Sequence, residues 1–470
     1  MSLASECGWA LIRAFAVAVA ALIVGHLVRD LIVTASRRER AAAWFLLLTP
    51  YLTPAPVVGY AYGSFALSLL HHPAWNQVFY GALLWLKLAP LAALVLYFAP
   101  SALSSEAIHC HRLLTTRSPA RRIRDFLFRV RGSARPSGAA FALVFLSAFT
   151  EFEIASLVGI KTWTVVLFDA HAGGLQLTQS LRLVFLPAVV EAAILLAGMA
   201  VLVGIRPPAH RLSRERSRDL PQSGRSAWGF LAVDFGVVTV APLTIVLRGT
   251  VQGISVLFQD FVLGKDIVAS LIFAVAGAAC AYLVASTWSY GRKRMGWAFV
   301  ACFPGLLGPL VLGLLILAVF QLPGLRAAYD TPLPLLLALT LLFLPFALLL
   351  RMLLTIHRPV EALHAARLLG ESTSASVRGR GQAISRFIQT RGRFWVLFLL
   401  FSWGYFDLTA SSLLAPTRLT PVFVRLYNLM HYGQMAVLSA MVCAALCVPL
   451  ILLGAAAGFR ALLLRAEFNG

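Results

Sequence analysis

Three carboxylates stand inside apolar segments of the chain, where a charged side chain is destabilising and is therefore rare unless it has a function. Glu151 and Glu153 lie in the apolar segment 137–158, and Asp407 lies in the segment 394–415. Carboxylates at such positions can face a water-filled interior, where they line a solute pathway or carry protons. We therefore expect Glu151, Glu153 and Asp407 to line a translocation path. The alternative is that they lie near helix ends, where their side chains reach headgroups or water.

Four other ionisable residues lie in or beside apolar segments, namely Lys87, Glu191, Asp234 and Arg351. Lysine and arginine can extend a charged end group to the membrane surface along an aliphatic stem. We expect Lys87 and Arg351 to do so, and we keep Glu191 and Asp234 as further candidates for the path. No nucleophile–base signature and no HEXXH sequence stands out, so no catalytic residue is predicted.

A nine-residue sequence occurs twice. Residues 106–114 read EAIHCHRLL and residues 361–369 read EALHAARLL, with six of the nine positions identical. The charged and histidine positions that the copies share are Glu106 and Glu361, His109 and His364, and Arg112 and Arg367. An acidic residue at the start and Gly370 just after the second copy predict a short helix. A pair of such helices suits docking of two identical partner subunits; the alternative is a surface helix that rests on the bilayer.

Metal and cofactor chemistry finds little support in the sequence. His109 and His111 are two residues apart, which does not place both on one helix face. The six cysteines are scattered, without CxxC spacing. We therefore predict neither a metal site nor a cofactor. The chain also lacks a GxxxxGK[ST] sequence, so any ATP chemistry has to reside on another chain.

The elements that must position these residues are membrane helices. The chain is 60% hydrophobic and only 13% charged, with a mean hydropathy of +0.82, whereas soluble domains are about 25% charged. Apolar runs near 20 residues must be helices in a bilayer. An all-α, polytopic protein with about eleven transmembrane helices is predicted. The expected spans are 9–28, 41–68, 78–100, 137–158, 181–204, 229–247, 264–288, 296–321, 333–354, 394–415 and 435–458.

The basic residues are distributed very unequally between the loops. One set of alternate loops and the C-terminal tail holds 30 lysines and arginines, and the opposite set holds 4. Positive charge marks the cytoplasmic side, which puts the N-terminus outside and the C-terminus and both copies of the repeated sequence in the cytoplasm. This distribution accounts for the net charge of +21 without nucleic acid. The first apolar run has no evident cleavage site and is expected to be a retained helix.

The repeat extends beyond the loop at a nearly constant offset of 254–255 residues, which relates Pro50 to Pro304 and Glu153 to Asp407. Further on, the predicted outer loops match, with Phe168 and Asp169 corresponding to Tyr427 and Asn428. Matched positions are six predicted helices apart, so the two repeats are expected to be parallel. The predicted organisation is a first module 1–205, a basic linker 206–228 and a second module 229–470.

Two such modules, each with a loop of this kind before its fourth helix, resemble a fused permease of binding-protein-dependent ABC importers, of the iron(III)/thiamine type. In that family the loop carries the sequence E-A-A-x-x-x-G and forms the helix that docks on the ATPase. Ala365, Ala366 and Gly370 fit this pattern, and His364 stands where the family has its glutamate. The first copy keeps neither the family's glutamate nor its glycine. The stretch VRLYNLMHYG, residues 424–433, is similar to a segment of iron-type permeases.

The resemblance implies a subunit of the bacterial inner membrane with no catalytic activity of its own. It implies a type I permease fold in which a periplasmic solute-binding protein delivers iron(III) or a small organic solute such as thiamine. A separate ATPase, expected as a homodimer, supplies the energy, and membrane lipid surrounds the helices. Two alternatives stay open: a secondary transporter coupled to protons through Glu151, Glu153 or Asp407, and a membrane assembly protein without transport activity.

Overall fold

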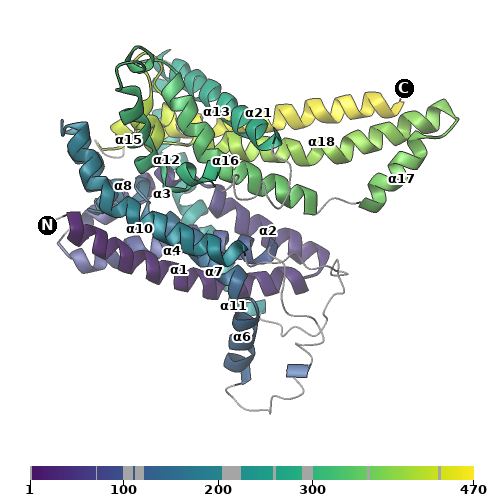
Figure 1. The fold of residues 1–470 in the computed structure, drawn as a ribbon, viewed down its shortest axis with the longest axis horizontal. Helices are drawn as coiled ribbons and strands as arrows, with labels where there is room; N and C mark the ends of the chain where they lie inside the picture. Colours follow the sequence, from purple (N-terminus) through teal and green to yellow (C-terminus); the bar gives the residue numbers. More distant parts are fainter. Residues whose placement is uncertain are drawn as a thin grey trace. The chain divides into compact units, whose positions relative to one another are not determined.

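The computed structural model describes residues 3–69, 71–98, 110–111, 121–203, 224–257, 261–287, 300–356, 360–431 and 436–469. Throughout these residues every regular element is helical, and no strand occurs in them. The prediction of an all-α protein is confirmed. Figure 1 traces the helices along the chain.

The chain divides into two compact units, Met1–Ile245 and Val246–Gly470. The helices of unit 1 are α1 (Leu3–Thr34), α2 (Arg37–Leu52), α3 (Ala55–Ser68), α4 (Pro73–Phe98), α6 (Arg121–Gly132), α7 (Ala134–Phe149), α8 (Glu153–Val158), α9 (Trp163–Ala172), α10 (Leu177–Val203), α11 (Gly224–Asp234) and a π-helical turn, η1 (Phe235–Val240). Helix α12 (Ala241–Leu257) crosses from the first unit into the second.

In unit 1, α1 packs against α4 and α7, and α3 packs against α8. Helix α1 also exposes Trp9, Ile12 and Phe15, which are each more than half exposed. Their spacing of three residues puts these apolar side chains on one side of the helix. A stripe of this kind fits contact with lipid.

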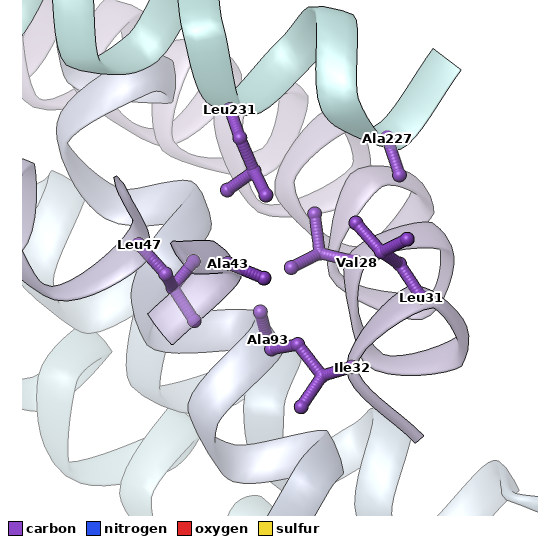
Figure 2. Close-up of a cluster of buried hydrophobic side chains, with 8 residues drawn as sticks. All are labelled: Val28, Leu31, Ile32, Ala43, Leu47, Ala93, Ala227 and Leu231. Atoms are coloured by element: carbon purple, nitrogen blue, oxygen red, sulfur yellow. The ribbon is translucent and has the colours of Figure 1, made fainter. Parts of the chain in front are cut away.

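A hydrophobic cluster joins α11 to the first unit. Val28, Leu31 and Ile32 of α1 contribute to it together with Ala43 and Leu47 of α2 and Ala93 of α4 (Figure 2). Ala227 and Leu231 of α11 are fully buried in the same cluster. The sequence grouped 229–470 as the second module, whereas in the structure residues up to Ile245 belong to unit 1. Burial of this α11 face accounts for the difference, because these side chains find their apolar partners on α1, α2 and α4.

Unit 2 contains α13 (Phe261–Thr287), α15 (Pro309–Phe320), a 3-10 turn, η2 (Arg326–Ala328), α16 (Leu333–Ile356), α17 (Val360–Gly370), α18 (Ala375–Tyr405), α19 (Thr409–Leu414), α20 (Val422–Met430) and α21 (Ala436–Asn469). Here α13 packs against α16 and α18, and α15 packs against α19. A short helix, Val300–Leu306, precedes α15 and is bent from it by 110°.

Among the described residues seven helices are long and apolar enough to cross a membrane, or up to nine if each of two bent pairs is one span. The sequence predicted eleven. The bent pairs are α2 with α3, at 75°, and Val300–Leu306 with α15. The other two expected spans, 137–158 and 394–415, are interrupted between α7 and α8 and between α18 and α19. The long apolar helices fit a multi-pass membrane protein.

Candidate functional site

Glu151 occupies the break between α7 and α8. Its carboxylate accepts the backbone N–H groups of Ile154 at 2.5 Å and Ala155 at 3.1 Å. The hydroxyl of Tyr80, on α4, donates to the same carboxylate at 2.6 Å. The hydroxyl of Thr164 donates to the Glu151 backbone carbonyl at 2.8 Å. A carboxylate here satisfies N–H groups that have no helical partner at the start of α8.

Asp407 has the same role in unit 2, in the break between α18 and α19. Its carboxylate accepts the backbone N–H and the hydroxyl of Ser411, both at 2.9 Å. The offset had paired Glu153 with Asp407, but the hydrogen bonds make Glu151 the counterpart of Asp407. Glu153 is instead the first residue of α8 and lies within electrostatic range of Lys87. All three carboxylates are half-buried.

Replacing Asp407 separates a capping role from a charge-carrying role. We expect Asp407→Ala to lower the free energy of unfolding by about 1–2 kcal/mol, because the Ser411 groups lose their acceptor. Asp407→Asn retains an acceptor oxygen and should lose only a few tenths of a kcal/mol, since asparagine caps helices as well as aspartate does. Thermal unfolding in detergent measures both. Equal destabilisation by the two variants would contradict the capping role.

A second polar cluster surrounds the break between α2 and α3. The ammonium of Lys87, on α4, donates to the backbone carbonyls of Pro50 and Tyr51, both at 2.8 Å, and to the carbonyl of Thr53. Lys87 was expected to extend to the membrane surface; it instead points to backbone oxygens within unit 1. Arg351 likewise donates to the carbonyl of Ala285 on α13. Both side chains therefore donate hydrogen bonds to backbone carbonyls of neighbouring helices.

Two carboxylates are fully buried in unit 1. Asp234 ends α11 and Glu191 lies in α10, and both have 0% exposure. Within the described part of the chain, none of their four carboxylate oxygens has a hydrogen-bond partner. Buried polar groups are almost always hydrogen-bonded. Such exceptions are expected at functional positions.

Sequence reasoning overlooked Arg13 and Tyr80. The guanidinium of Arg13, on α1, donates to the side chain of Gln77 at 2.8 Å and lies 4.7 Å from the centre of the Tyr80 ring. Tyr80 in turn donates to Glu151, so α1, α4 and α8 are linked by one polar chain. An arginine inside the apolar run 9–28 was the signal that could have revealed it.

The second copy of the repeated sequence forms α17, which packs against α18. Glu361 lies in its first turn. Ala366 is buried, Gly370 is half-buried, and His364, Ala365 and Arg367 are exposed. A Cβ atom on Gly381 of α18 would lie 2.8 Å from the Ala366 carbonyl oxygen, so glycine permits the close approach of the two helices. In the first copy, Glu106, His109 and Arg112 lie outside the described residues, as do residues 206–223 of the linker.

The matched outer-loop residues occupy corresponding places on two short helices. Phe168 and Asp169 are the sixth and seventh residues of α9, and Tyr427 and Asn428 are the sixth and seventh of α20. Asp169 and Asn428 are exposed, Phe168 is half-buried and Tyr427 is buried. The shared pattern leaves one polar side chain of each helix accessible.

Each of these two helices is held to its own unit by a buried polar contact. The indole N–H of Trp163, the first residue of α9, donates to the Phe149 carbonyl at 2.8 Å. The first N–H of α20, on Val422, donates to the hydroxyl of Ser270 at 2.7 Å. A salt bridge between Arg425 and Asp266, at 3.1 Å, also joins α20 to α13.

Comparison with known proteins identifies no relative: no family model, no curated protein and no solved structure matches the chain. Over the residues that the structure describes, no group of three or more histidine, cysteine, aspartate or glutamate side chains could hold a metal ion.

Proposed function

We propose that this chain is the membrane permease subunit of an importer that is powered by a separate ATPase. The observation that carries the proposal is an exposed apolar surface on the short helix α17. Leu368 and Leu369 are 57% and 41% exposed beside the exposed His364. Because α17 follows a helix of membrane length and lies on the basic side of the chain, this surface would face the cytoplasm.

The packing of α17 suits a helix that transmits force. Its buried Ala366 contacts α18, and the approach of the Gly381 backbone fixes the two helices closely together. Helix α18 is 31 residues long and runs to the Asp407 break. A displacement of α17 by a docked ATPase would therefore reach the interior of unit 2 through one continuous helix.

The order of helix contacts supports a duplicated module. In unit 1, α1 contacts α4, α7 and α9, and α10 contacts α7 and α9. In unit 2, α13 contacts α16, α18 and α20, and α21 contacts α18 and α20. Helices that hold the same place in the chain order of the two units therefore contact corresponding partners, as parallel repeats require. Two modules would receive an ATPase homodimer, with the first docking loop at residues 106–114.

The outer helices α9 and α20 would meet the solute-binding protein on the opposite side of the membrane. In this proposal the protein is a multi-pass subunit of a bacterial inner membrane, with its N-terminus outside and its C-terminus in the cytoplasm. The solute is iron(III) or a small organic molecule such as thiamine, as the family resemblance implies. Glu151, Glu153 and Asp407 stay candidates for the path.

A proton-coupled secondary transporter is the second candidate, and the observation that favours it is specific. Asp234 and Glu191 are buried carboxylates whose oxygens lack hydrogen-bond partners in the described residues. An intramembrane carboxylate of this kind is suited to take up and release a proton. Uptake that collapses on loss of the proton gradient, while ATP is maintained, would establish this candidate instead.

Purification of the tagged protein in mild detergent tests the importer proposal. We expect an ATPase to co-purify with it, and we expect Leu368→Asp to abolish this association, because a charge would replace an apolar contact in the docked surface. Leu325→Asp is the matched control. Leu325 is 42% exposed and precedes α16, whereas α17 follows α16, so the control lies at the opposite end of that helix.

The protein must elute as a folded species in every case. A folded protein without ATPase, under conditions in which a control importer stays assembled, would overturn the proposal. Equal loss of the ATPase from both leucine variants would show that α17 is not its docking site.

A further inference from the structure

The break between α2 and α3 has two positions without a backbone hydrogen-bond donor because of its prolines. In a continuous helix the N–H of residue 54 would bond to the carbonyl of Pro50, and the N–H of residue 56 to the carbonyl of Leu52. Both positions are proline, which has no N–H. The N–H of Val57 bonds to the carbonyl of Pro54 rather than that of Thr53. Backbone oxygens at the end of α2 are thereby left to other partners.

The Lys87 ammonium donates to the backbone oxygens at this break. It has three N–H groups, and it donates to three carbonyls, those of Pro50, Tyr51 and Thr53. The end of a helix that carries free carbonyls also carries the negative end of the helix dipole. The arrangement is therefore a positive charge held by backbone oxygens, which is how selectivity filters bind potassium.

A buried carboxylate provides the opposite charge. Asp234 lies within electrostatic range of Lys87 and is fully buried, and neither of its oxygens has a hydrogen-bond partner in the described residues. It immediately precedes the π-helical turn η1, an element often found at functional sites. The hydroxyl of Thr239 in that turn lies 3.1 Å from the hydroxyl of Thr53, so η1 borders the break directly.

The corresponding break in unit 2 has a leucine where unit 1 has its lysine. Leu342 stands at the repeat offset from Lys87. There a Cβ atom on Gly305 would lie 3.2 Å from the Leu342 Cα, so the break packs directly on the backbone of α16. The helix before the unit 2 break thus lies against the α16 backbone itself. A tethered positive charge is therefore a particular feature of the first break and not a requirement of such bends.

We propose that the α2–α3 break is a monovalent-cation site that Lys87 occupies with its own ammonium, with Asp234 as the counter-charge. Removal of the lysine side chain then opens the site to a free cation, either an alkali ion or a small primary ammonium ion. The proposal holds for either kind of transporter, since it concerns the internal chemistry of unit 1 alone.

Thermal unfolding of Lys87→Ala in detergent tests the site. At constant ionic strength we expect potassium, sodium or ethylammonium chloride to raise the unfolding temperature of this variant by about 5 °C relative to choline chloride, because choline is too large and lacks N–H groups. The wild-type protein should not respond. Lys87→Met, whose longer side chain fills the site without a charge, should not respond either.

Two further variants make the result specific. Lys87→Ala combined with Asp234→Asn should lose most of the cation response, since the fully buried counter-charge is gone and Glu153, the other carboxylate near Lys87, is only half-buried. Arg351→Ala removes another basic side chain from a helix carbonyl and should give no response. If Lys87→Ala fails to fold, the yield of folded protein extracted with ethylammonium is compared with the yield in choline. Equal stability or equal yield in all salts overturns the proposal, as does an identical response of the wild-type protein.

Discussion

Replacing Lys87 with methionine is expected to lower the free energy of unfolding of unit 1 by about 3–5 kcal/mol. Methionine has a similar length, so the main loss is three charge-assisted hydrogen bonds to the carbonyls of Pro50, Tyr51 and Thr53. Proline at position 54 leaves the Pro50 carbonyl without a helical N–H donor to replace the ammonium. The unfolding temperature in detergent should fall by about 10 °C, at roughly 2–4 °C per kcal/mol for a domain of this size.

Leu342→Met is the matched control for this prediction. It places the same new side chain at the repeat offset in unit 2, where no charge is lost. A volume-conserving exchange of this kind is expected to change the stability by less than about 1.5 kcal/mol. A Lys87→Met protein as stable as the Leu342→Met protein would show that the break does not depend on the ammonium.

Replacing Trp163 with alanine is expected to lower the free energy of unfolding by about 3–5 kcal/mol. Trp163 is fully buried, its ring lies 5.4 Å from that of Phe149, and its indole N–H donates to the Phe149 carbonyl. Alanine would leave a cavity and an unsatisfied carbonyl at the end of α7. Helix α9 begins at this residue, so its exposed Asp169 should become mobile.

Trp163→Phe separates the two contributions. Phenylalanine retains much of the ring packing and loses the N–H donor, so the expected loss is about 1–2 kcal/mol. Thermal unfolding in detergent measures the stabilities. Spin labels on an Asp169→Cys background measure the motion of α9. Unchanged label mobility in Trp163→Ala would show that α9 is held by other contacts.

The sequence by itself determined the broad character of the protein. Apolar runs near 20 residues have to be helices, because a bilayer offers no partners to exposed backbone groups. Proline, which lacks a backbone N–H, stands at both bends, as Pro54 in the first bent pair and Pro309 in the second. The second copy of the repeated sequence forms a helix, α17, as its acidic start and Gly370 predicted. These features depend on local chemistry, which any stretch of sequence carries with it.

The tertiary structure alone decided which partner each polar side chain has. A fixed offset paired Glu153 with Asp407, yet Glu151 caps α8 as Asp407 caps α19. Glu151 and Asp407 each lie at a break in a segment that mean hydropathy predicted as one continuous span. An average over a window of residues does not detect a single capping residue.

The same limit applies to Lys87 and to α11. From the sequence, the aliphatic stem of Lys87 was expected to carry its ammonium to the membrane surface. The basic linker 206–228 was expected to separate the segment from residue 229 from the first module. The structure places the carbonyls of Pro50, Tyr51 and Thr53 within reach of Lys87, and an apolar surface on α1 beside Leu231. Contacts between residues distant in sequence depend on the packing of several helices at once, and no single segment encodes that arrangement.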